Sequence, residues 1–256
     1  MNNTFNIKRF GRLLIKQLTE HYKTYLMGVA VLTGVMLVGG SFFLFLTPAV
    51  LDLSAQVVLF GSIYFLAGTI FTSTVFADLS DKKKSISYLT LPASHFEKFF
   101  TGWLISMVLF SLVYLVSFYS ILMILLHVKH WPGQRTEVLN VFVDPMPVVF
   151  IVYAMLHGFS IWGAIFFERL HFIKTAFCFF IGIIALSVVN TSFIEMLLGR
   201  EVRTATPFGG ISFIEGHKYV AVASVRQTDP LVGYVFIAIA IVFWTAAYCR
   251  LKEKQV

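Results

Sequence analysis

The chain has 256 residues, of which 58% are hydrophobic and only 13% are charged, against roughly 45–50% and about 25% in an ordinary soluble domain. This composition excludes a typical soluble protein and predicts an all-α integral membrane protein, with one membrane domain over residues 1–256. The formal charge of +7 would raise the question of nucleic acid in a soluble protein. In a membrane protein we expect the distribution of the basic residues to reflect the orientation of the spans, and we expect no nucleic-acid partner.

Residues 5–24 combine apolar residues at helical spacing with basic residues at the positions between them. The apolar residues are Phe10, Leu13, Leu14, Leu18 and Tyr22. We expect an amphipathic helix along the membrane surface, its basic face towards the anionic head groups of membrane lipid. A generic anchor and a specific functional element both fit this pattern.

Six apolar runs are long enough to cross a bilayer, whose core of about 30 Å requires roughly 20 residues of helix. They are Tyr25–Leu46, Val57–Phe76, Trp103–Val128, Val148–Phe167, Phe172–Val189 and Leu231–Cys249. The fifth has the least defined limits, because Lys174 lies near its start and an apolar continuation, "SFIEMLL", follows it. The sequence therefore predicts six transmembrane helices.

The first run contains the stretch "GVMLVGGS" at residues 34–41. It has the two glycines of a phosphate-binding loop but Gly40 where the lysine belongs, so we expect no ATP binding there. Small residues allow helices to approach closely in lipid. We therefore interpret these glycines as packing sites.

The basic residues predict the orientation of the six spans, which place both termini on one side. The four segments on that side carry 14 of the lysines and arginines, and the opposite side carries six. Because cytoplasmic loops carry the excess of basic residues, we expect both termini in the cytoplasm. The chain would be a multi-pass protein of the cytoplasmic membrane.

Signatures of an enzyme are weak. Gly158-Phe159-Ser160-Ile161 lacks the second glycine of a G-x-S-G turn, and His157, Glu168 and His171 do not follow the H-E-x-x-H pattern. We assign no catalytic, cofactor or metal residues. The polar candidates within the apolar runs are His157, Asn190 and Glu195; we expect His157 to hydrogen-bond a neighbouring helix.

The longest segment on the outer side is residues 199–230. Ile211–Ile214 and Tyr219–Val225 are rich in residues that favour strands and flank a turn at Glu215–Lys218. This pattern predicts a small β-hairpin. A lid, a binding surface and a structural cap over the helix ends are all compatible with it.

The cytoplasmic loop at residues 78–101 contains "YLTLPASHFEKFF" after "DKKK". Pro92 disfavours helix at Leu91, and Ser94 with Glu97 forms the pattern of a capping box that starts a new helix. Asp81 in the same way caps a short predicted helix over residues 82–90. A solvated loop with ordinary caps and a docking site for a partner both fit. The candidate partner-contact residues are Asp81, Lys82, Lys83, Lys84, Leu89, Leu91, Pro92, Ser94, His95 and Glu97.

The order of a basic amphipathic helix, six spans and this loop resembles the permease subunits of type-2 ATP-binding-cassette transporters. The sequence-specific part of the resemblance is "LTLPAS" at Leu89–Ser94. It implies a bacterial inner-membrane permease whose loop contacts a separate ATPase subunit, with ATP and Mg on that subunit and no cofactor on this chain. It also implies a second permease subunit alongside, and a re-entrant segment after the fifth span, for which Ser192–Leu198 is the candidate.

The sequence does not define the cargo of such a permease, since lipid-like, peptide, drug and polysaccharide substrates would all suit an apolar dimer interface. The main alternative function is a membrane-anchored interaction, sensor or assembly protein that transports nothing. An ATPase encoded next to this chain would favour the permease.

Overall fold

The computed structural model describes residues 5–46, 51–79, 85–86, 88, 90–128, 137–199, 201–205, 210–215, 218–222 and 230–254. Within these residues, six helices are long and apolar enough to cross a membrane. The protein is therefore an all-α, multi-pass membrane protein, as its composition predicted. A small three-stranded sheet is attached to one of the six helices.

Each of the six candidate spans begins before its predicted apolar run; two end one residue short of the run, and the other four reach or pass its end. They are α2 (Tyr22–Leu46), α3 (Leu53–Val75), the continuous helix His95–Val128, α7 (Met146–Phe166), α8 (His171–Leu198) and α9 (Pro230–Glu253). The third consists of α5 (His95–Trp103), a π-helical segment (Leu104–Leu109) and α6 (Phe110–Val128). A short 3-10 helix, η1 (Ala77–Leu79), follows α3.

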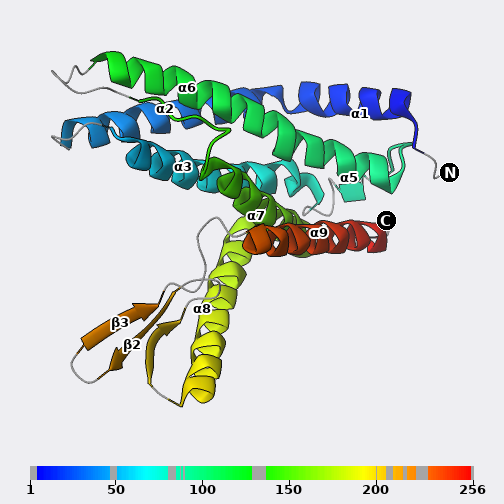
Figure 1. Cartoon of the computed structure of the whole chain (residues 1–256). Coiled ribbons are helices and arrows are strands. Elements are labelled where there is room, and N and C mark those ends of the chain that lie inside the picture. The colour runs from blue at the N-terminus through cyan, green and yellow to red at the C-terminus, as the bar shows by residue number, and fades with distance from the viewer. Residues whose placement is uncertain are drawn as a thin grey trace.

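The predicted amphipathic helix forms as α1 (Ile7–Glu20), with Asn6 as its N-cap. The chain bends at His21 and continues as α2. Figure 1 shows α1 beside α5, at the end of the bundle that carries both termini, which we call the terminal end. Leu13 is buried, and Leu14 and Leu18 pack against the core at this end. Protein thus covers Leu13, Leu14 and Leu18, whereas Tyr22 is half exposed.

Aromatic side chains from α3, α6 and α7 form the centre of the bundle. Tyr64, Tyr114 and Tyr153 are fully buried, and the ring centroids of Tyr64 and Tyr153 lie 4.3 Å apart. The Tyr114 hydroxyl donates to the carbonyl of Phe60 at 2.7 Å. A Cβ on Gly68 would lie 2.3 Å from the Tyr153 ring, so α3 and α7 approach this closely only because residue 68 has no side chain.

The glycine-rich stretch of α2 packs closely at one position. A Cβ on Gly40 would lie 2.4 Å from Leu125 of α6, whereas Gly34 and Gly39 face open space. The packing role predicted for these glycines is therefore confirmed for Gly40 alone.

Helix α8 leaves the bundle at a steep angle, with the sheet beside it (Figure 1). It continues without a break to Leu198 and ends at Gly199, whose φ of 61° is left-handed. Ser192–Leu198 therefore extends the helix, and the expectation that this segment is re-entrant is wrong: its residues contain neither proline nor glycine to turn the chain back.

The sheet contains β1 (Val202–Ala205), β2 (Ile211–Glu215) and β3 (Lys218–Val222) in the order β1-β2-β3, all antiparallel. The pairing of β2 with β3 confirms the predicted hairpin. Strand β1 was not predicted, because a four-residue segment, "VRTA", is too short to show an alternating pattern.

Candidate functional site

The loop predicted to contact a partner leads into α5 through a complete capping box. The Ser94 hydroxyl accepts from the Glu97 amide at 3.1 Å, and the Glu97 carboxylate accepts from the Ser94 amide at 2.8 Å. This reciprocal pair satisfies two amides that a helix start leaves without partners. The sequence prediction for this helix start is confirmed. We call residues 90–103 the elbow.

The Glu97 carboxylate also fastens α1 to the elbow. Its Oε1 accepts from the Asn6 amide at 2.7 Å and from Arg9 Nη2 at 3.0 Å. The Glu97 side chain is fully buried, while that of Arg9 is one-third exposed. A single carboxylate therefore caps α5 and holds the first turn of α1. Because it points inward, it positions the elbow and does not itself present a charge to a partner.

Two pairs of aromatic rings lie along the junction between the start of α1 and α5. The rings of Phe10 and Phe100 lie 5.4 Å apart and those of Phe5 and Phe96 lie 6.0 Å apart, measured between centroids. Phe5 and Phe96 are each about half exposed, at 48% and 47%. An exposed aromatic pair beside a rigid helix start is typical of a protein contact surface.

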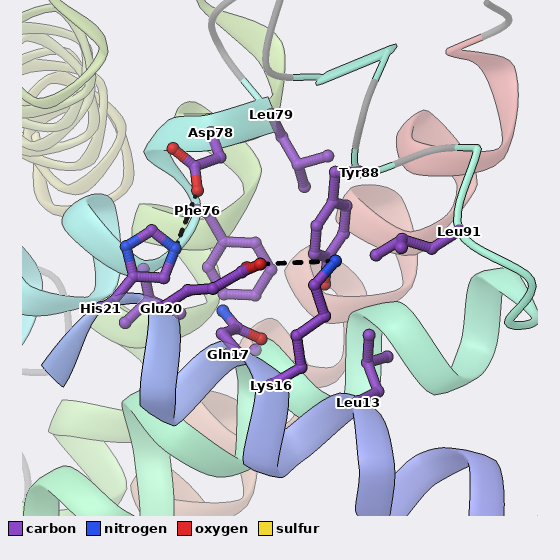
Figure 2. A pocket seen from close by; sticks show the side chains of 12 residues that line it. Leu13, Lys16, Gln17, Glu20, His21, Phe76, Asp78, Leu79, Tyr88 and Leu91 are labelled. Atoms are coloured by element: carbon purple, nitrogen blue, oxygen red, sulfur yellow. Dashed lines mark ion pairs between the residues drawn. The ribbon is translucent and has the colours of Figure 1, made fainter.

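A cavity of about 260 Å³ lies behind the elbow, between α1, η1 and the end of α3. Figure 2 shows Gln17 and Glu20 of α1, with His21 directly after that helix, on one side of it, facing Tyr88 and Leu91. The side-chain oxygen of Gln17 is buried and has no hydrogen-bond partner within the described part of the chain. The cavity is thus partly polar and large enough for several water molecules.

Ion pairs line two walls of this cavity (Figure 2). His21 Nε2 lies 3.1 Å from the Asp78 carboxylate, and Lys16 Nζ lies 3.5 Å from that of Glu20. The first pair joins the bend between α1 and α2 to η1. The second lies within α1 and is solvent-exposed, so it contributes little to stability.

Two further contacts hold the elbow to the terminal end. The Tyr88 hydroxyl donates to the carbonyl of Lys98 at 3.0 Å, and burial of the phenol raises the pKa of Tyr88. Lys254, just after α9, donates to the carbonyl of Leu79, and burial lowers the pKa of this ammonium. The segment that leads into the elbow is therefore held to α5 through Tyr88 and to the end of α9 through Leu79.

The ten predicted partner-contact residues fall into three groups. Asp81, Lys82, Lys83, Lys84 and Leu89 lie outside the described residues, as does most of the predicted helix over 82–90. Ser94 and Glu97 are buried in the capping box, and Leu91 and His95 are partly buried. Pro92 is exposed. Phe96, which the prediction omitted, is the exposed aromatic of the elbow.

His157, the polar candidate of α7, joins three helices, as predicted for a buried histidine in a span. Its Nδ1 accepts from Trp244 Nε1 of α9 at 3.1 Å, so its Nε2 carries the proton and donates to the Ser106 hydroxyl at 2.9 Å. That hydroxyl donates to the Gly102 carbonyl at 2.7 Å. The Tyr153 hydroxyl donates to the Ser106 carbonyl at 3.0 Å. Ser106 lies in the π-helical segment, a feature frequently found at functional sites.

Asn190 and Glu195, the other polar candidates, attach the sheet to α8. The Asn190 amide donates to the carbonyl of Ala205 at 2.9 Å, and the Glu195 carboxylate accepts from the Val202 amide at 3.1 Å. Both side chains therefore bind backbone of β1. Their role in the structure is to hold the sheet.

Sequence reasoning missed the partners of Glu97 on α1. Asn6 carries a usable signal, since an asparagine directly before an amphipathic helix is a preferred N-cap. Arg9 carries none, because 88 residues separate it from Glu97. In the described part of the chain, no cluster of three or more His, Cys, Asp or Glu side chains is arranged to hold a metal ion.

Comparison with protein-family models, curated proteins and solved structures finds no match to this chain. The sequence and the fold therefore establish a multi-pass membrane protein, and the site itself must carry any argument for function.

Proposed function

We propose that this chain is the permease subunit of an ATP-driven transporter and that a separate ATPase subunit docks on its elbow. The observation that supports this proposal best is the mechanical continuity of the elbow. The helix that begins at the Ser94–Glu97 capping box runs without interruption through α5, the π-helical segment and α6 to Val128. A displacement at the elbow therefore moves a whole candidate span.

The elbow is also fixed firmly enough to transmit force. Glu97 ties its first turn to α1, and Tyr88 ties the preceding segment to α5. Thr90, Pro92 and Phe96 are exposed in the elbow, and of these Pro92 and Phe96 present apolar side chains. We propose that these two contact the partner, and that the buried Ser94 and Glu97 keep them in place.

In this proposal the partner subunit binds ATP and Mg, and this chain binds no cofactor and catalyses no hydrolysis. The chain functions with a second permease subunit in the inner membrane of a bacterium, with both termini and the elbow in the cytoplasm. The excess of basic residues on the segments at the terminal end supports this orientation. A cysteine at Ser85 should then be shielded from an impermeant thiol reagent in intact cells.

The test is purification of the tagged chain from its native membrane, followed by identification of whatever remains bound. We expect an ATPase with both phosphate-binding motifs, and we expect Phe96→Asp to remove it. The control is Phe142→Asp, since Phe142 is 89% exposed in the connection between α6 and α7, at the opposite end of the bundle. Equal recovery of the ATPase with both variants would refute docking at the elbow. Recovery of other proteins without any ATPase would favour the non-transporting alternative.

A further inference from the structure

An apolar groove runs between α2 and α3 and ends against the start of α6. Its volume is about 430 Å³. The α2 wall contains Gly28 and Val35, the α3 wall contains Ile63 and Phe71, and Val113 closes it from α6. A Cβ on Gly28 would meet nothing within 4 Å. The groove is therefore open space at membrane depth with an almost wholly hydrocarbon lining.

The groove occupies only the half of the spans nearest the terminal end. On α2 it extends from Thr24 to Val35, which at 1.5 Å per residue is about 16 Å, close to half of the roughly 30 Å hydrocarbon core. Beyond Val35 it closes, because Met36 and Leu44 are buried and Gly40 packs on Leu125. Its length thus matches one leaflet of a bilayer.

We propose that this groove binds one acyl chain of an anionic phospholipid from the leaflet at the terminal end. Carbon atoms in van der Waals contact lie about 4 Å apart, so a hydrocarbon chain fills a cylinder roughly 5 Å wide, or roughly 300 Å³ over this length. One such chain fits the groove. A helix from a second subunit is the competing occupant, because α2 exposes apolar side chains from Met27 to Phe45, and the test below distinguishes the two.

The mouth of the groove is basic. Lys23 is exposed and lies four residues before Met27, which lines the groove together with Val31. Residues four apart share one face of a helix, so Lys23 lies one turn before Met27 and directly before Thr24, where the lining begins. The carboxylate of Asp78 is ion-paired with His21. The positive charge of Lys23 at the mouth therefore favours a lipid whose phosphate is not neutralised by an amine in the same head group.

The test measures retention of phosphatidylglycerol by the delipidated chain, using native mass spectrometry in detergent with phosphatidylcholine as the competing lipid. Gly28→Phe fills the groove and should weaken binding at least tenfold. Gly34→Phe is the matched control, because Gly34 lies on the same helix, also faces open space and does not line the groove. Lys23→Gln should abolish the preference for phosphatidylglycerol but retain binding of either lipid, whereas Lys174→Gln should change neither.

A second measurement works even if Gly28→Phe does not fold. A benzophenone amino acid at Val35, which lines the groove, should capture phosphatidylglycerol in preference to phosphatidylcholine from vesicles that contain both in equal amounts, whereas one at Val38, which is exposed outside the groove, should capture the two lipids equally. Cross-links between two copies at Val35 would show that a second chain fills the groove and would overturn the proposal. The same lipid preference at Val35 and Val38, or equal lipid retention by the two glycine variants, would also overturn it. None of these results depends on an ATPase partner.

Discussion

Glu97→Ala is the most informative single substitution in this protein, because one buried carboxylate serves two helices. The change removes the acceptor for the amides of Ser94 and Asn6 and for the guanidinium of Arg9. The spans themselves are held by insertion into lipid. We therefore expect the membrane helices to remain and α1 to separate from the elbow.

The size of the effect follows from burial. Removing one partner of a buried ion pair typically costs about 3–5 kcal/mol, but Arg9 is one-third exposed and can recover part of its hydration. The lower limit, about 3 kcal/mol, is therefore the better estimate. With a factor of ten for every 1.4 kcal/mol, the docking equilibrium of α1 on α5 should shift roughly a hundredfold towards the open form.

Chemical cross-linking measures this equilibrium directly. Cysteines replace Phe5 and Phe96, whose ring centroids are 6.0 Å apart, in a background with Cys178→Ser and Cys249→Ser, and a short bifunctional thiol reagent joins them. The parent should cross-link rapidly within one chain, and Glu97→Ala should cross-link far more slowly. Glu253→Ala is the control, because Glu253 pairs with Arg250 at the surface, where its side chain is 63% exposed. Equal cross-linking rates in the parent and in Glu97→Ala would refute the claim that Glu97 holds α1 against the elbow.

Three further predictions concern the spans and the chemistry. Gly68→Ala should overpack the Tyr153 ring and cost about 1–3 kcal/mol, lowering the thermal stability in detergent, whereas Gly34→Ala, which faces open space, should not. His157→Leu should leave the Trp244 N–H without its acceptor and destabilise the fold by about 1–3 kcal/mol. The same thermal assay measures this loss, and a melting temperature equal to that of the parent would contradict the prediction. The purified chain alone should release no phosphate from ATP. Turnover that persists after removal of every co-purifying ATPase would contradict the proposal that a separate subunit hydrolyses ATP.

The sequence predicted the parts of the fold that depend on local patterns. Apolar runs of sufficient length identified the six spans, and Ser94 with Glu97 identified the start of α5, because both signals lie within a few adjacent residues. The pairing of β2 with β3 was predicted for the same reason, from two β-rich segments around one turn.

The contacts that build the site were not predictable in this way. Arg9 and Glu97 form an ion pair although 88 residues of sequence separate them. The apolar pattern of α1 does not specify whether lipid or protein covers it. Nothing in "LTLPAS" indicates that Leu91 faces a cavity (Figure 2) while Phe96, five residues later, is exposed. The sequence left the end of α8 undefined because Glu195 lies in the apolar continuation Ser192–Leu198; in the structure its carboxylate accepts a hydrogen bond from the backbone of β1.

The central claim is that a partner ATPase is coupled through the elbow, and stimulation of that ATPase by the reconstituted permease tests it most directly. The co-purified partner is measured in proteoliposomes with the parent chain, with Phe96→Asp, with the double variant Ser94→Ala/Glu97→Ala and with the control Phe142→Asp. We expect full stimulation by the parent and by Phe142→Asp, and a loss of most of it for both elbow variants although they insert normally. Undiminished stimulation by both elbow variants would contradict the account.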